Sequence, residues 1–500
     1  MTRRRDFIRS GLLGAAGLTI GGLGFKAGSY RSIAGSNNEI RVAVLGMGNR
    51  GLGYAIPQLV KLPGVKIVAV CDPDRERLAL GGTLVFKSCG YKPDEVVDLR
   101  HIMDRKDVDL VSVDTMQYWH ALPAIWACEA GKDVYVEKPL SHFIWEGRQM
   151  VNAARKYDRI VQVGMQSRSF RPAYDELLSW LREGNLGKIL YALCFSCKPR
   201  HNIGKRSEPL PIPKTLDYDL WCGYTSNGPI YRDKIQYDCS FTWDKGDGES
   251  VNQGVHQVDD ARWVLGYTGL PPRTMSIGGR FLFNDAGDVP NMQINCLDYP
   301  EAPIFYVCYN LPANKEMAGR LDADRSLFRN SKGYSGVGVH IQCENGSVFL
   351  PNEDEKVTLK VFDSNGNKIK EFTGEENHYS NLLYAMRERN RELLNADILE
   401  GHRSTILCHA ANISLRLGSP APVAEQKKLV DECSSPYFQE IHDHYVKHLE
   451  GLGIDPGTSS TGPWLECDPE RESFKSNPGA NEFVKGLYRK EYRVPEVRSR

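Results

Sequence analysis

Two short stretches of the sequence combine side chains that can move a proton. In AGKDVYVEKPL, Glu137 and Lys138 follow strand-forming residues and stand directly before Pro139. In NQGVHQVDDARWVLG, Asn252 and His256 are four residues apart, which places them on one face of a predicted helix. An imidazole with an ordinary pKa near ~6.5 suits proton transfer at neutral pH, and an ammonium stabilises a developing alkoxide. Taken alone, each stretch also has a structural interpretation. Lys138 fits a solvated surface lysine, and His256 fits a structural histidine paired with a neighbouring aspartate.

A glycine pattern lies upstream, in IRVAVLGMGNRG. The apolar run before it predicts a strand, and RGLGYAIPQLVKL after it has the spacing of a helix. Gly46 would allow the tight turn, Gly48 would let the backbone approach a pyrophosphate, and Gly51 would permit close packing of helix on sheet. Asp72 ends the next predicted strand about 20 residues on, as a dinucleotide-binding fingerprint requires.

These residues predict a nicotinamide dinucleotide as cofactor. A carboxylate at Asp72 would accept hydrogen bonds from the ribose 2'-hydroxyl and repel a 2'-phosphate, so NAD is favoured over NADP. Arg75 and Arg77 nearby keep NADP open. The predicted cofactor-binding residues are Gly46, Met47, Gly48, Asn49, Arg50, Gly51, Asp72, Glu137 and Lys138.

The order of predicted elements places these residues at one edge of a sheet. In the first third, apolar strands alternate with helices, which predicts an α/β fold with a Rossmann doubly wound parallel sheet over 38–165. Ligands bind beyond the carboxyl ends of such strands. Later strands with Glu-Asn-Gly and Asn-Gly-Asn turns predict an α+β domain over 166–430 with a mostly antiparallel open sheet. Residues 431–500 form an extension that we expect to pack on the domains.

Within the second domain, a Pro-rich irregular stretch from Lys198 to about Tyr237 follows the predicted strand KILYALCFSC. Its aromatic residues, including Trp221, Tyr231 and Tyr237, are candidates for shaping a sugar pocket. His120, His378 and His402 are further candidates for the pocket, although each is more often a structural or surface residue.

Composition narrows the classes of partner. Lys+Arg and Asp+Glu both number 63, so the chain has no global basic field for nucleic acid. No apolar run reaches the ~18 to 20 residues of a membrane span. The 13 cysteines lack the paired spacing of a zinc site, so we expect most of them to be buried apolar residues and expect no metal.

The N-terminus has the features of an export signal. Arg4 and Arg5 precede an uncharged Gly/Ala/Leu stretch from Gly11 to Phe25. This order is similar to that of a twin-arginine signal peptide over 1–34, with Ser32-Ile33-Ala34 as the best cleavage pattern. We therefore expect a periplasmic protein; a frayed basic end before a glycine-rich linker is the alternative.

Together, GMGNRG, CDPD, GKDVYVEKPL and GVHQVDDARWVLG resemble the Gfo/Idh/MocA oxidoreductase family, which includes glucose-fructose oxidoreductase and inositol dehydrogenase. The resemblance implies that Lys138 contacts both nicotinamide and a substrate hydroxyl, and that His256 is the acid/base. It also implies a homodimer or homotetramer formed through the open sheet of the second domain. The family typically has aspartate where this chain has Asn252, so the basicity of His256 is open, and Glu249 is a possible substitute.

Three functions remain open at this level. A folded protein exported with its cofactor would have to return that cofactor to its starting state in each cycle. The first candidate is therefore an oxidoreductase that acts on sugar hydroxyls with a tightly bound, recycled dinucleotide, and the presence of Lys138 favours it. The second is an NAD-dependent glycosidase or lyase that works by transient oxidation and elimination. The third is a non-catalytic sugar-binding protein that retains the cofactor, which Asn252 favours.

Overall fold

The computed structural model describes residues 39–311, 336–351 and 358–498. The predicted signal peptide and its cleavage pattern lie outside the described residues. Among the helices of the described residues, none has the length and hydrophobicity that crossing a membrane requires.

The first sheet is parallel and has six strands in the part of the chain that the structure describes. Its order is β3-β2-β1-β4-β5-β6, so the direction of the crossovers switches between β1 and β4. This confirms the predicted doubly wound sheet and puts the ligand position above these two strands. The strands are β1 (Ile40–Leu45), β2 (Val65–Cys71), β3 (Asp94–Val96), β4 (Leu110–Val113), β5 (Asp133–Val136) and β6 (Val161–Val163).

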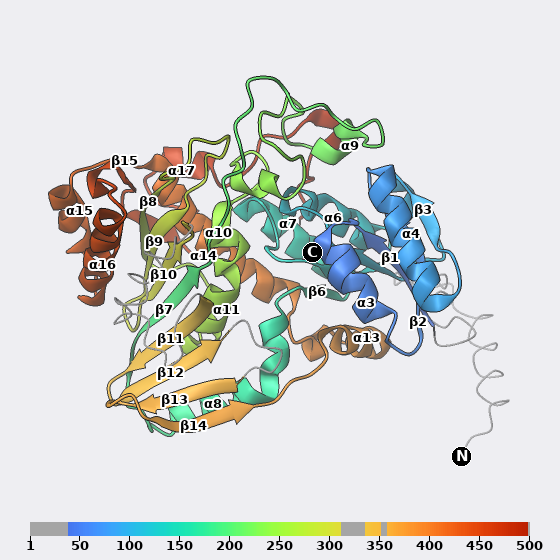
Figure 1. Ribbon diagram of the computed structural model, residues 1–500. Helices are drawn as coiled ribbons and strands as arrows, with labels where there is room; N and C mark the ends of the chain where they lie inside the picture. Colours follow the sequence, from blue (N-terminus) through green and yellow to red (C-terminus); the bar gives the residue numbers. More distant parts are fainter. Residues whose placement is uncertain (1–38, 312–335, 352–357, 499–500) are drawn as a thin grey trace, which may run out of the picture.

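Helices cover both faces of this sheet (Figure 1). One face carries α6 (Ala121–Glu129) and α7 (Ile144–Lys156). The other carries α3 (Ile56–Leu59), α4 (Arg75–Cys89) and a helix from much later in the chain, α13 (His378–Glu388). Burial of α13 against the strands ties the second half of the chain to the first sheet.

Among the described residues, the second sheet has twelve strands, and all its pairings are antiparallel except that of β7 with β10. This confirms the mostly antiparallel prediction. Its longer strands are β7 (Ile189–Cys197), β8 (Arg273–Gly279), β9 (Met292–Asp298), β10 (Ile304–Tyr309), β11 (Gly336–Cys343), β12 (Gly346–Pro351), β13 (Thr358–Asp363) and β14 (Lys368–Thr373), and the short ones are β15 (Ser419–Pro420), β16 (Ser460–Thr461), β17 (Leu465–Asp468) and β18 (Ser473–Phe474).

Helices cover parts of both faces of this sheet. One face packs against α8 (Arg171–Arg182), α11 (Gly254–Leu265) and α14 (Ile398–Leu417). On the other, Phe438 and Tyr445 of α16 (Tyr437–Gly451) lie in one buried cluster with Phe305 and Ile294 of the sheet. The preceding helix, α15 (Val423–Val430), adds Val430 to this cluster. The C-terminal helices α15 and α16 therefore cover the sheet over β9 and β10, on a face where we expected a subunit interface. The oligomeric state stays a prediction.

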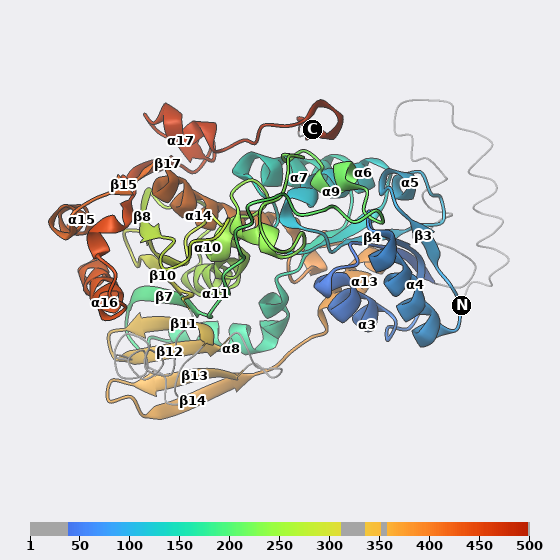
Figure 2. The ribbon, with the colours of Figure 1, turned by 45° about the horizontal axis from the view of Figure 1, so that its top comes forward.

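The end of the chain returns to the first domain (Figure 2). After α17 (Pro478–Glu482), the backbone runs beside α7: Trp145 N donates to Val484 O at 3.0 Å, and Asn152 Nδ2 donates to Val497 O at 2.8 Å. The C-terminal extension thus contacts the second sheet through α16 and the first domain through its last residues.

A buried ion network joins α11 and α14. Asp259 accepts from Arg168 Nε and Nη2, both at 2.8 Å, and from Ser404 Oγ at 2.5 Å. Arg262 Nη2 bridges Asp259 and Glu400 at 3.3 and 2.6 Å. Burial alone would raise the pKa of Asp259, but the charges of Arg168 and Arg262 hold it below its usual value. The carboxylate of Asp259 therefore belongs to this buried ion network, and it forms no ion pair with His256.

Replacing Asp259 by alanine is expected to lower the free energy of unfolding by about 3–5 kcal/mol, because it leaves the buried guanidinium groups of Arg168 and Arg262 with only the partly exposed Glu400 as counter-charge. Denaturant unfolding of the purified variant measures this. Asp175→Ala is the control: its contact with Arg171, at 3.6 Å, lies on the surface and should contribute almost nothing. Equal stabilities of the two variants would contradict the role assigned to Asp259.

Candidate active site

The glycine turn is built as the fingerprint requires. Gly46, at the end of β1, has φ +93°, and a Cβ there would lie 2.6 Å from Asp114 O. A Cβ on Gly51 would lie 1.9 Å from Gly46 O, so this position needs glycine for the helix to pack. At Gly48, by contrast, a Cβ would have no protein atom within 4 Å. Gly48 thus presents bare backbone to open space, as close approach by a pyrophosphate requires.

The next strand end supplies a carboxylate beside this turn. Asp72 directly follows β2, and its two oxygens accept from Met47 N at 2.7 Å and Asp74 N at 2.9 Å. Burial raises the pKa of Asp72. Arg77 Nη1 donates to Met47 O at 3.3 Å, so a cation lies beside the carboxylate. A carboxylate suits a 2'-hydroxyl and a guanidinium suits a 2'-phosphate, so the residues at this end accommodate either dinucleotide.

Met47 differs from the other predicted cofactor residues. Its side chain is fully buried and lies so close to Gly81 that a Cβ there would be 2.3 Å from the sulfur. Only its backbone faces the turn. The sequence predicts Met47 as a cofactor-binding residue in the loop between Gly46 and Gly48. In the structure, its apolar side chain belongs to the core under β1 and β2.

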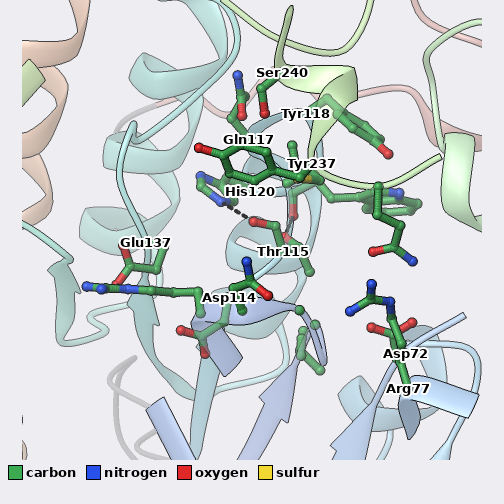
Figure 3. Close-up of a pocket in the computed structure, with 18 of the residues that line it drawn as sticks. Asp72, Arg77, Asp114, Thr115, Gln117, Tyr118, His120, Glu137, Tyr237 and Ser240 are labelled. Carbon is green, nitrogen blue, oxygen red and sulfur yellow. Dashed lines mark hydrogen bonds and ion pairs between the residues drawn. The ribbon is translucent and has the colours of Figure 1, made fainter. Parts of the chain in front are cut away.

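A cavity of about 720 Å³ opens above the strand ends. In Figure 3, Asp72 and Arg77 lie at one end and Glu137 toward the other, with Asp114 between them. Tyr237 and Ser240 approach from the second domain. Of the predicted residues, Gly46, Gly48, Asn49, Arg50, Asp72, Glu137, Lys138 and Asn252 line it.

Glu137 and Arg50 neutralise each other inside the cavity. Arg50 Nε lies 2.7 Å from Glu137 Oε1, which also accepts from Tyr135 Oη at 2.9 Å. Burial would raise the pKa of Glu137, but the charges of Arg50 and Lys138 keep it below its usual value. Glu137 is therefore an ionised anchor that holds Arg50 and the neighbouring backbone in place, in addition to lining the cavity.

Lys138 begins a chain of polar contacts that crosses between the domains. Its Nζ donates to Asn252 O at 2.8 Å and to Asn252 Oδ1 at 3.2 Å. Asn252 Nδ2 donates to Glu249 Oε1 at 2.9 Å, and Arg200 Nη2 lies 2.7 Å from Glu249 Oε2. Burial, partly offset by Glu137, lowers the pKa of Lys138 to about 8. Glu249 thus reaches the lysine through the amide of Asn252.

Asn252 and His256 do not share one continuous helix, which corrects the sequence prediction. Asn252 ends α10 (Gly248–Asn252), and α11 begins at Gly254. A Cβ at Gly254 would lie 2.7 Å from the ring of Tyr306, so the chain passes too close to β10 to hold a larger residue at the break. The break lets the backbone carbonyl of Asn252 bond to Lys138, which an uninterrupted helix would not allow.

His256 lies partly buried at the start of α11; Asn252 and Gln253 before it line the cavity, whereas His256 itself is not among the lining residues. No described residue hydrogen-bonds its ring. Burial and the nearby charges of Lys138, Arg50 and Lys198 hold the pKa of His256 well below its usual value. The imidazole is therefore neutral at pH 7 and available as a proton acceptor. Neither Asp259 nor Glu249 contacts it.

The cavity also includes Asp114, which was not among the predicted site residues, and His120, which was one of the three further histidine candidates; His378 and His402 are not among its lining residues. Asp114, directly after β4, has its pKa raised to about 7 by burial and the charge of Glu137. The ring nitrogens of His120 lie 2.7 Å from Pro139 O and 3.2 Å from Thr115 O, so this histidine holds the backbone beside Lys138. The signal for Asp114 was available, because it ends a predicted strand of the parallel sheet.

The second domain contributes Lys198, Arg200, Trp221 and Tyr237 to the lining, whereas Tyr231 is exposed and lies outside it. Nothing in the sequence pattern marked Lys198 or Arg200, since both lie in an irregular stretch that only the fold brings to the cavity.

Comparison with known proteins supports the prediction that the first domain has a dinucleotide-binding Rossmann fold. Residues 40–165 match the Gfo/Idh/MocA model, an oxidoreductase family with an NAD-binding Rossmann fold. Glycosyl hydrolase family 109 proteins are similar over part of the chain: those of Shewanella pealeana and Solibacter usitatus are each 30% identical over 206 and 204 residues. These alignments cover 38% of this chain and 44% of each relative, so the chain matches less than half the length of these curated relatives.

Solved structures share the fold over most of the chain. The WlbA dehydrogenase from Bordetella pertussis, in complex with NADH and UDP-GlcNAcA, superposes with a TM-score of 0.51 at 17% identity, covering 76% of this chain and 97% of its own. A levoglucosan dehydrogenase in complex with NADH gives a TM-score of 0.52 at 16% identity, covering 74% and 95%. These likenesses establish the two-domain fold.

Proposed function

We propose that this chain is an NAD(P)-dependent oxidoreductase that acts on a hydroxyl of a sugar or sugar derivative with a tightly bound dinucleotide. The observation that carries the proposal is the position of Lys138, which lies at the carboxyl end of β5, in the same cavity as the glycine turn, with Nζ fixed by Asn252. The family match of the first domain supports it, as do the NADH bound to both structural neighbours, the UDP-GlcNAcA bound to the WlbA dehydrogenase and the name of the levoglucosan dehydrogenase.

The residues present fit a dinucleotide. The open space at Gly48, the helical turn that begins at Asn49, and the carboxylate of Asp72 form a cradle for a pyrophosphate and a ribose. The cavity of about 720 Å³ extends from there to Lys138. When bound, the nicotinamide would supply the two-electron oxidant that side chains alone lack. NAD is our proposed cofactor, on the position of Asp72.

The side chains around Lys138 account for the proton transfer. The ammonium of Lys138 would bind the oxygen of the substrate hydroxyl and stabilise negative charge as it develops. The neutral ring of His256 would accept the hydroxyl proton. Asn252 would keep Nζ in position through two contacts, at 2.8 and 3.2 Å. In the reverse direction, the same groups would return the proton to a carbonyl oxygen.

The pH dependence of kcat/KM tests these protonation states. Lys138 is cationic below its pKa of about 8, so kcat/KM for oxidation is expected to fall as pH rises through about 8. Because the pKa of His256 lies well below its usual value, no acid-side loss is expected between about pH 6 and 7. Lys138→Arg should remove the alkaline fall, since guanidinium stays protonated. An unchanged fall in that variant would assign it to another group.

The most direct test of the reaction class is product analysis. Purified protein is incubated with sugars and glycosides, without added cofactor, and the products are identified by mass spectrometry. An oxidised product together with a reduced acceptor supports the proposal. A released aglycone with no net redox change would support the second candidate, a glycosidase or lyase acting by transient oxidation, which the glycosyl hydrolase names of the curated relatives favour.

We further propose that the protein is exported to the periplasm by the twin-arginine route. The order of Arg4, Arg5 and the uncharged stretch that follows supports this proposal. Fractionation of cells that express the full chain tests it. Substituting both arginines by lysine is expected to leave the protein inside the cell, and unchanged export of that variant would contradict the route.

A further inference from the structure

The second domain lines the cavity with charges of one sign. Lys198 and Arg200 follow β7 directly, and both face the cavity. Among the described residues, every carboxylate of the lining, Asp72, Asp114 and Glu137, comes from the first domain. The second domain's wall is therefore basic, and Lys138 of the first domain adds a further cation at the same place.

Only one of these cations is neutralised by a carboxylate of its own domain. Arg200 pairs with Glu249, whose side chain is 2% exposed and lies outside the cavity lining. Within the part of the chain that the structure describes, Lys198 Nζ has no ion pair, and Arg200 Nε is buried without a hydrogen-bond partner. Lys198 is therefore a partly buried cation without a paired carboxylate, beside a guanidinium that has an unused N–H donor. This arrangement is unfavourable, which points to an anion as the ligand that completes the wall.

The backbone holds both cations in fixed positions. Lys198 N donates to Asn310 Oδ1 at 3.2 Å, and Arg200 N donates to Asn310 O at 2.9 Å. Asn310 directly follows β10, the strand that pairs with β7. The two side chains therefore start from backbone that is attached to the ends of two central strands, and this attachment limits the reorganisation that binding would require.

The phosphates of the dinucleotide do not account for these cations. Asp72 and Arg77 lie at one end of the cavity (Figure 3), and both hydrogen-bond the backbone of Met47 in the glycine turn; all of these residues belong to the first domain. Lys198 lies close enough to His256 for its charge to act on the ring, as does Lys138. Lys198 and Arg200 thus belong to the part of the cavity where the substrate hydroxyl would meet Lys138 and His256.

We propose that the substrate is an anionic sugar, with a carboxylate or phosphate group that Lys198 and Arg200 bind. The inference rests on the proposed function and names its substrate class. It also explains how the chain works with Asn252 in place of an aspartate. The anion of the substrate would bring negative charge to the cations that depress the pKa of His256, so the histidine becomes a stronger base when the substrate is bound.

Calorimetry on the purified full-length protein, with its resident cofactor, tests this inference. The probes are D-glucuronate and D-galacturonate for the carboxylate, glucose 6-phosphate for the phosphate, and D-glucose and D-galactose as neutral parents. We expect one anion class to bind at least about 10-fold more tightly than its neutral parent. Lys198→Met should remove this preference, because a methionine keeps the length of the side chain without its charge. Lys205→Met, on the exposed part of the same stretch, is the matched control.

Each outcome decides the inference. A preference for an anion that Lys198→Met abolishes and Lys205→Met leaves intact supports it, and the preferred probe identifies carboxylate or phosphate. Equal or tighter binding of the neutral sugars, no binding of any anion, or a preference that survives in Lys198→Met overturns it. Dinucleotide content is measured separately on the same preparation, so absence of cofactor would count against the proposed function while the binding data still decide the substrate class.

Discussion

Replacing Lys138 by alanine is expected to lower kcat about 1,000-fold or more while the dinucleotide stays bound. The reason is that the ammonium is the cation fixed by Asn252 beside His256, and removal of a positioned electrostatic or acid-base group typically costs ~10² to 10⁴ in rate. Steady-state kinetics, together with the dinucleotide content of the purified variant, measure both effects.

Lys87→Ala, on the exposed last turn of α4, is the control and should keep full turnover. The same experiment separates an enzyme from a sugar-binding protein that retains the cofactor. A binding protein would keep its affinity for the sugar in Lys138→Ala and would have no turnover to lose. Wild-type turnover in the variant would remove Lys138 from the mechanism.

Replacing Gly48 by alanine is expected to weaken dinucleotide binding at least about 100-fold without destabilising the fold. A Cβ at this position meets no protein atom within 4 Å, so the protein itself tolerates it. The added methyl group would instead occupy the space through which a pyrophosphate approaches the backbone. Loss of two hydrogen bonds to a charged group, at about 1.5–3 kcal/mol each, gives this magnitude.

The matched control is Gly451→Ala on α16, where a Cβ also meets no atom within 4 Å. Both variants should unfold at the same denaturant concentration as the parent protein. Only Gly48→Ala should be purified without dinucleotide. A cofactor-free Gly451→Ala, or a fully loaded Gly48→Ala, would contradict the placement of the pyrophosphate over the glycine turn.

Much of the first domain could be predicted because its signals are local. The strand before Gly46, the glycine spacing and Asp72 at the next strand end lie within about 30 residues of one another and have fixed geometric consequences. The parallel sheet follows from the alternation of buried strands with helices. For the same reason, Lys138 could be placed at the ligand-binding edge from its position before Pro139.

The remaining features depend on contacts between distant parts of the chain. The hydrogen bonds between Lys138 and Asn252 join residues 114 positions apart, and the break before Gly254 follows from its closeness to Tyr306 on β10. Helical spacing alone predicted an unbroken helix there. Likewise, α16 covers the second sheet because of apolar residues whose partners lie more than a hundred positions upstream.

The role of Asn252 illustrates the difference. From the sequence, an amide in place of a carboxylate put the basicity of His256 in doubt. In the structure, Asn252 contacts Lys138 instead of His256, and it connects the lysine to Glu249. The amide of Asn252 therefore affects the position and charge of Lys138 directly. The pKa of His256 is lowered instead by burial and by the cations around it.

The measurement that tests the central claim most directly is the amount of dinucleotide released when the natively purified, desalted protein is denatured. The account predicts close to one molecule of NAD or NADP per chain, and turnover of sugars without added cofactor. Protein that releases none, and that turns over only when dinucleotide is supplied, would contradict a resident cofactor above the glycine turn.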